Sequence, residues 1–118
     1  MLPWSSVWWP EICECAEKNG SSAAEIIDLV SRQHAMGMPV GEDGYFVLAF
    51  TEDNALLAWI AVGRNAREWV GQAEFQARAI AKALGMTKMR IEDSRRGWER
   101  LLPHWTRVGD DLELHFDG

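Results

Sequence analysis

An arginine-rich segment near the end of the chain, RRGWERLLPHW at residues 95–105, holds the side chains best suited to chemistry. Guanidinium groups bind phosphates through paired hydrogen bonds, and an imidazole such as that of His104 can transfer protons near neutral pH. The segment could therefore be a phosphate or nucleic-acid site, a catalytic helix, or the last packed turn of a small domain. The net charge of −6 and the pI near 5.0 make a nucleic-acid partner a poor expectation, since such a protein needs basic charge to displace counterions.

The arginines of this region form a candidate positive patch on an acidic protein. Ion pairs with nearby acidic residues on a solvated face would explain them without any function, because each such pair contributes only about 0–1 kcal/mol. The functional alternative is a docking surface for an acidic partner or for packaged DNA. The patch consists of Arg95, Arg96, Arg100 and Arg107, and its candidate acidic neighbours are Glu92, Asp93 and Glu99.

Seven tryptophans and two cysteines are the other unusual side chains. Trp4, Trp8 and Trp9 are more than one helix end needs for core packing, so we predict that some of them are exposed at a protein contact. Cys13 and Cys15 are two positions apart and cannot bridge each other in a helix or a strand. Since no CxxC motif or histidine pair accompanies them, we expect buried, reduced thiols and no metal site.

The length of 118 residues predicts a single domain over residues 1–118, and its polar breaks and apolar runs divide it into elements. A helix over residues 10–18 follows the tryptophan-rich start, and a second follows from Ser21 or Ser22, with Glu25 completing a capping box. Residues 34–44 are expected to be a loop because of their glycines and proline. No apolar run approaches the ~20 residues of a membrane span, and the start lacks the basic and apolar regions of a signal peptide.

The rest of the chain predicts a mixed α/β (α+β) sheet with helices on its faces. Strands over residues 45–50 and 55–62 form a hairpin, and a helix over residues 66–84 leads to a strand over residues 87–92, parallel to the second hairpin strand. Ser94 caps a short helix. The long helix turns Trp69, Ala73, Ala77, Ile80 and Leu84 inward; the final strand, residues 111–116, turns Leu112, Leu114 and Phe116 inward and Glu113 and His115 outward.

This order of elements resembles the GNAT fold of N-acetyltransferases over residues 22–116. Within that superfamily the chain looks most like short GNAT-like proteins of tailed phages. The resemblance lies in Gly63, Glu68 and Trp69 of GRNAREW, in RGWERLL at residues 96–102, and in the WWPEI helix. Only two strands are predicted before the long helix, so the fold is expected to be a truncated GNAT-like one.

The resemblance implies that coenzyme A, where it binds, lies against a glycine-bearing loop at the start of the long helix. Those glycines let backbone N–H groups approach the pyrophosphate. If Arg64 opens the pattern, Arg67 and Trp69 occupy the glycine positions, and their bulk is expected to close the site. Gly63, Arg64, Asn65 and Arg67 are the candidate cofactor-binding residues if the protein is active.

The resemblance also implies a general acid, commonly a tyrosine on the short helix, where this chain has Leu101 and Leu102. The one tyrosine, Tyr45, opens a strand elsewhere. His104, Glu52 and Glu92 are possible substitutes, although a histidine beside a tryptophan in a turn is more often a packing residue. We therefore assign no catalytic residue from the sequence.

These features predict a non-catalytic phage protein without a cofactor, which contacts other virion or assembly proteins in the virion or the host cytoplasm. The alternative is an active N-acetyltransferase that holds acetyl-CoA through side chains instead of a glycine loop. A small host-directed inhibitor is a third, minor alternative.

Overall fold

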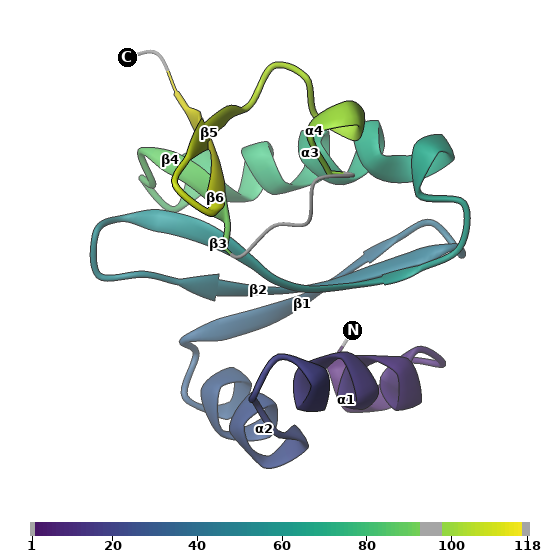
Figure 1. Ribbon diagram of the computed structural model, residues 1–118. Helices are drawn as coiled ribbons and strands as arrows, with labels where there is room; N and C mark the ends of the chain where they lie inside the picture. The colour runs from purple at the N-terminus through teal and green to yellow at the C-terminus, as the bar shows by residue number, and fades with distance from the viewer. Residues whose placement is uncertain (1, 93–97, 117–118) are drawn as a thin grey trace.

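In the computed structural model, which describes residues 2–92 and 98–116, helices cover both faces of a mixed sheet (Figure 1). The described strands form one six-stranded sheet in the order β1-β2-β3-β4-β6-β5. Helices α3 and α4 lie on one face, and α1 and α2 lie on the other. The elements are η1 Pro3–Ser5, α1 Trp9–Lys18, α2 Ala23–Ser31, β1 Ala35–Val40, β2 Gly44–Phe50, β3 Ala55–Gly63, α3 Ala66–Ala83, β4 Lys88–Ile91, α4 Trp98–Leu101, β5 Thr106–Val108 and β6 Asp111–His115.

The two N-terminal helices form as their capping residues predict. Pro10 stands in the first turn of α1, where its missing N–H costs no hydrogen bond. The Ser22 hydroxyl accepts a hydrogen bond from the Glu25 N–H at 3.1 Å, which confirms the predicted cap of α2. Ile12 and Ile26 are fully buried in the core that these helices form with β1, β2 and β3.

The predicted loop over residues 34–44 is wrong, because Ala35–Val40 form strand β1. Ala35, Met38 and Val40 are buried there, and β1 pairs with β2 along its whole length. Pro39 is tolerated because β1 is an edge strand, where a missing N–H breaks no ladder on the open side. Three strands therefore precede α3, one more than predicted, and β5 is a further unpredicted strand.

Helix α3 and its parallel crossover confirm the sequence prediction. Strand β4 pairs in parallel with β3 and antiparallel with β6. Trp69, Ala73 and Ala77 are buried as expected, but the inner stripe continues to Ala81. Leu84 is 52% exposed because the helix ends one residue before it, so its predicted inward position is wrong.

Trp69 fixes the first turn of α3 against the sheet. Its side chain is 6% exposed, and its ring meets the Phe46 ring edge-on at 5.6 Å between centroids. The indole N–H donates to the backbone carbonyl of Arg64 at 2.5 Å. Gly44 and Gly63 lie directly beneath the ring, and a Cβ on either would come within 2.9 Å of its atoms.

The packing around Gly63 predicts that two glycine substitutions change the free energy of unfolding in opposite directions. Gly63→Ala should lower the free energy of unfolding by about 3 kcal/mol, since the residue has φ +150° and its Cβ would lie 2.2 Å from the Asp43 carbonyl. Gly71→Ala in α3 is the matched control, because its Cβ meets nothing within 4 Å. This change should raise the free energy of unfolding by about 1 kcal/mol, as measured by urea denaturation of dilute protein. Equal effects of the two substitutions would contradict the packing described for Trp69.

Candidate functional site

Strands β3 and β4 pair over only three residues, and β3 then runs on past the end of β4. The opening beside this part of β3 is the centre of the candidate site. The pairing runs only from Ala55 to Leu57 on β3. Trp59 is an extra residue in β3, because Val47 lies opposite Ile60 while Leu48 lies opposite Ala58. A bulge of this kind bends its strand. Within the described residues, β3 beyond Leu57 thus has no ladder partner on its β4 side.

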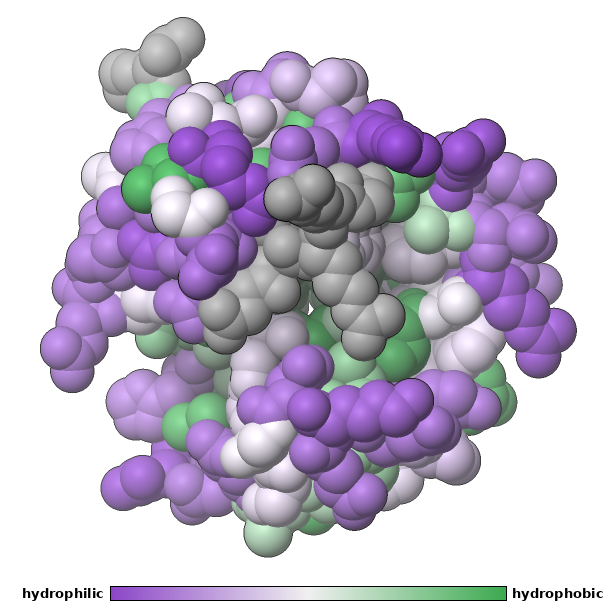
Figure 2. All heavy atoms as spheres, viewed as in Figure 1, coloured by the Kyte–Doolittle hydropathy of each residue, from purple (hydrophilic) through white to green (hydrophobic). Residues whose placement is uncertain are grey.

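Two pockets adjoin this opening, and three lining residues are common to both. A small apolar pocket of about 30 Å³ lies beneath α3 and α4, and a larger one of about 600 Å³ lies toward α1. Ala58, Ile91 and Trp98 line both pockets. Figure 2 shows hydrophobic residues in a recess on this side of the molecule, bordered by hydrophilic ones. The opening thus gives access to the sheet interior from two sides.

Glu74 of α3 holds two side chains beside the small pocket. One carboxylate oxygen lies 2.5 Å from His104 Nε2 and accepts a hydrogen bond from Trp105 Nε1 at 2.6 Å. The Glu74 side chain is 14% exposed, whereas that of His104 is half-exposed. With Nε2 turned toward Glu74, the Nδ1 atom is the imidazole nitrogen able to accept a proton from another group. Because Glu74 lies thirty positions from His104, no local pattern in the sequence predicted this contact.

The start of α3 lies at the end of β3, next to the opening. Asn65 precedes the helix in a left-handed conformation, and Arg67 is exposed in the first turn. The Arg64 guanidinium lies 5.7 Å from the centre of the Trp8 ring, toward α1. Of the two arginines, Arg67 is therefore the better placed to meet a phosphate at this helix end, where the N–H groups also favour an anion.

The expectation that Trp69 closes the site is wrong, whereas the same expectation for Arg67 stays a prediction. Trp69 turns inward onto Gly44 and Gly63, so its indole fills the core and does not project outward. Arg67 is exposed in the first turn of α3. Sequence position alone could not show which way these two large side chains turn.

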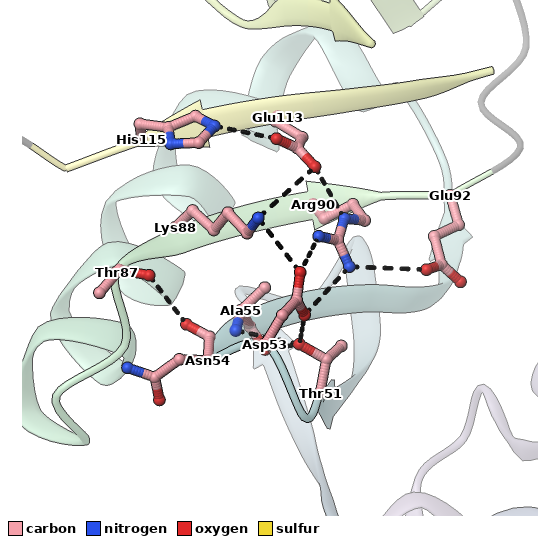
Figure 3. Close-up of polar contacts among 10 residues, drawn as sticks. All are labelled: Thr51, Asp53, Asn54, Ala55, Thr87, Lys88, Arg90, Glu92, Glu113 and His115. Atoms are coloured by element: carbon pink, nitrogen blue, oxygen red, sulfur yellow. Dashed lines mark hydrogen bonds and ion pairs between the residues drawn. The ribbon is translucent and has the colours of Figure 1, made fainter. Parts of the chain in front are cut away.

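A network of ion pairs runs along the short β3–β4 contact (Figure 3). Arg90 on β4 donates through Nε to Glu113 on β6 at 2.9 Å, and it also pairs with Asp53 in the turn before β3. Lys88 lies 3.1 Å from the same Asp53 carboxylate, and Glu92 lies 3.7 Å from Arg90. The network thereby links β3, β4 and β6.

Glu113 is buried, which corrects its predicted outward position. It is 8% exposed, and its second carboxylate oxygen lies 2.9 Å from Nε2 of His115, which does point outward. Burial raises the pKa of Glu113, but hydrogen bonds from Arg90 and His115 outweigh burial and hold the pKa below its ordinary value. Hydrogen bonds from Arg90, Thr51 and Lys88 hold the pKa of Asp53 well below its usual range. Both groups are therefore carboxylates at neutral pH.

The remaining candidate residues are scattered. Tyr45 is buried under α1 and α2, where burial raises its pKa to about 12. Trp4, Trp8 and Trp9 are half-buried, Arg100 is exposed, and Arg107 pairs with Glu99 and with the Asp110 carbonyl. Glu92 lines the larger pocket, whereas Glu52 lies in an exposed turn. Arg95, Arg96, Asp93 and the predicted Ser94 cap lie outside the described residues.

The described residues contain neither a cluster of metal-ligating side chains nor a helix that could span a membrane. In residues 2–92 and 98–116, no group of three or more His, Cys, Asp or Glu side chains is placed to hold a metal ion. Cys13 and Cys15 are half-buried thiols, and burial raises the pKa of Cys13. Among the described helices, none has the length and apolar character needed to cross a membrane.

The chain has a GNAT-like fold, as comparison with solved structures shows. An IAA acetyltransferase from Bacillus cereus aligns with a TM-score of 0.63 at 12% identity, over 98% of this chain and 96% of that one. The PaiA N-acetyltransferase from Thermoplasma acidophilum, solved with coenzyme A, aligns with a TM-score of 0.57 at 15% identity, over 79% and 68%. An acetyltransferase from Bacillus subtilis, solved with CoA, aligns with a TM-score of 0.52 at 16% identity, over 80% and 85%.

No protein-family profile matches the sequence, and no curated protein matches it significantly. The solved structures nevertheless correct the predicted non-catalytic virion role. All three are acetyltransferases, and two of them were solved with coenzyme A. The buried position of Trp69 removes its part of the steric argument for the non-catalytic prediction.

Replacing Arg90 should change the response of the fold to acid. A carboxylate whose folded pKa is lowered stabilises the fold above its unfolded pKa, and that stability is lost as the pH falls through the folded pKa. Arg90→Gln should therefore lower the free energy of unfolding at pH 7 and flatten its dependence on pH below about pH 5. Urea denaturation between pH 3 and pH 7 measures both effects. Arg32→Gln is the control, because Arg32 makes an exposed pair within α2; an unchanged pH profile in Arg90→Gln would contradict the network.

Proposed function

We propose that the chain is an acetyl-CoA-dependent N-acetyltransferase. The observation that carries this proposal is the parting of β3 and β4, which opens the sheet between two pockets with common lining residues. A cofactor entering from one side and an acceptor from the other can meet only at such an opening. The likeness to acetyltransferases solved with CoA supports the same assignment.

The residues around the opening fit coenzyme A in their chemistry. The first turn of α3 offers backbone N–H groups, and Arg67 adds an exposed guanidinium for the pyrophosphate. Gly63, Arg64 and Asn65 set the backbone path into this turn. Because Arg64 lies over Trp8, its guanidinium contributes to the α1 side of the site. Apolar residues on β3 and β4 suit the extended arm of acetyl-CoA that carries the acetyl group.

When bound, acetyl-CoA supplies an acetyl group activated as a thioester. The chain would supply proton transfer, which typically contributes 10²–10⁴-fold to the rate. Glu74, which lines the small pocket, orients His104 so that Nδ1 can hold or release a proton. Glu92 lines the larger pocket, where a carboxylate can bind an ammonium group or accept its proton. Ala58, Ile91 and Trp98 would exclude water between the two.

The resemblance to phage-encoded GNAT-like proteins stays a prediction about the source of the chain. Its solved relatives in fold come from Bacillus species and Thermoplasma acidophilum. The tryptophans and arginines named as partner contacts also stay predictions.

Arg67 should affect cofactor affinity. Acetyl-CoA at one hundred times its dissociation constant should stabilise the protein by about 2.7 kcal/mol, which appears as a rise of several degrees in Tm. Arg67→Glu should weaken binding by roughly 10–100-fold, because it removes a charge-assisted hydrogen bond and adds repulsion. Arg32→Glu on α2 is the control and should bind as the unaltered protein does. The absence of any Tm shift at millimolar acetyl-CoA in the unaltered protein would refute the proposal.

His104 should affect turnover more than binding. His104→Asn and Glu74→Gln should each lower kcat by roughly 10²-fold with little change in the KM for acetyl-CoA, since both disturb proton transfer. Release of free CoA thiol with a panel of aliphatic and aromatic primary amines measures both constants. His34→Asn, between α2 and β1, is the control. Unchanged kcat in both variants would remove His104 from the mechanism while leaving the binding site in place.

A further inference from the structure

The outer face of α3 carries a stripe of five exposed residues that the proposed function does not use as a set. At 100° per residue, all five lie within about 40° of the direction in which Phe75 projects. Phe75 is 75% exposed, at the middle of the stripe, and the charged members stand at its two ends. The stripe consists of Glu68, Gly71, Phe75, Ala79 and Lys82, and all are exposed.

The fold of the single chain does not account for this composition. A large aromatic side chain gains nothing from standing in water, and a glycine inside a helix costs about 1 kcal/mol relative to alanine. A Cβ at Gly71 would meet nothing within 4 Å, so the chain itself needs no glycine there. Within the described part of the chain, neither Glu68 nor Lys82 has an ion-pair partner. Close approach of another surface would explain all of these features.

The stripe is complementary to itself. If two α3 helices cross antiparallel about a two-fold axis at Phe75, Gly71 of each copy lies opposite Ala79 of the other. Small residues beside an aromatic one let helix backbones approach closely. Glu68 of each copy then lies opposite Lys82 of the other, so the two-fold symmetry forms two equivalent ion pairs between opposite charges. The parallel arrangement would place Glu68 against Glu68 and Lys82 against Lys82, which is repulsive.

We propose that this face of α3 binds the same face of a second copy of the chain, in an antiparallel two-fold dimer. Glu68 and Lys82 are 14 residues apart, which corresponds to about 21 Å along the helix. A contact of one helix face on each side falls in the size range of weak, reversible interfaces. The dimer therefore forms at high protein concentration and dissociates on dilution.

Sedimentation equilibrium of the full chain between about 10 and 500 µM tests the proposal. The unaltered protein should show a reversible monomer–dimer equilibrium. Lys82→Glu should weaken the dimer by roughly tenfold, because it turns both symmetry-related attractions into repulsions. The double variant with Glu68→Lys and Lys82→Glu should restore it, since each reversed charge again faces its opposite. Phe75→Asp should leave only monomer.

Lys18→Glu is the matched control, because Lys18 is an exposed lysine in the last turn of a different helix, α1. It should leave the equilibrium unchanged. Circular dichroism and the urea midpoint show whether each variant folds. If Phe75→Asp does not fold, Lys82→Glu and the double variant with Glu68→Lys decide the test. A protein that stays monomeric at 500 µM overturns the proposal. The proposal is also overturned if Lys82→Glu leaves the dimer dissociation constant unchanged, or if the double variant does not restore the dimer.

Discussion

The architecture depends on one constraint, which is that β3 and β4 pair for three residues and then part. Two features enforce it. The ion-pair network of Asp53, Lys88, Arg90 and Glu113 ties the short strand β4 to its neighbours at one end. At the other end the bulge at Trp59 bends β3, which continues to Gly63 beneath the Trp69 ring. A continuous ladder here would leave no passage through the sheet.

Trp69 connects this constraint to the chemistry. Its indole closes the core between α3 and the β2–β3 hairpin, and the hydrogen bond to the Arg64 carbonyl fixes the backbone just before the helix. The first turn of α3 is thereby held at the end of β3, beside the opening. The same helix carries Glu74 two turns further along, where it orients His104 and Trp105. One helix thus presents both a candidate phosphate-binding turn and a candidate proton-transfer pair.

The sequence predicted those features whose signals are local. Ser22 and Glu25 marked the cap of α2, and the periodic apolar residues of α3 marked its buried face. It failed where distant contacts decide. Strand β1 was hidden by Gly37 and Pro39, which an edge position tolerates, and Glu113 was expected outside because only the fold brings Arg90 to it.

The site was harder to predict than the fold, for the same reason. The direction of the Trp69 side chain follows from the space above Gly44 and Gly63, which are 25 and 6 positions away in the sequence. The likeness of RGWERLL to phage-encoded proteins pointed toward a role without catalysis, whereas the geometry of the opening points toward acyl transfer. The motif at residues 96–102 carries no information about the pairing of β3 with β4, which ends at Leu57 and Arg90.

The central claim is that coenzyme A binds where β3 and β4 part. The most direct measurement is a titration of acetyl-CoA into ¹⁵N-labelled protein, followed by amide chemical shifts. The account predicts saturable shifts in two groups of amides, those of the first turn of α3 and those of β3 from Ala58 to Ala61. Shifts confined to other parts of the chain, or none at millimolar acetyl-CoA, would contradict it.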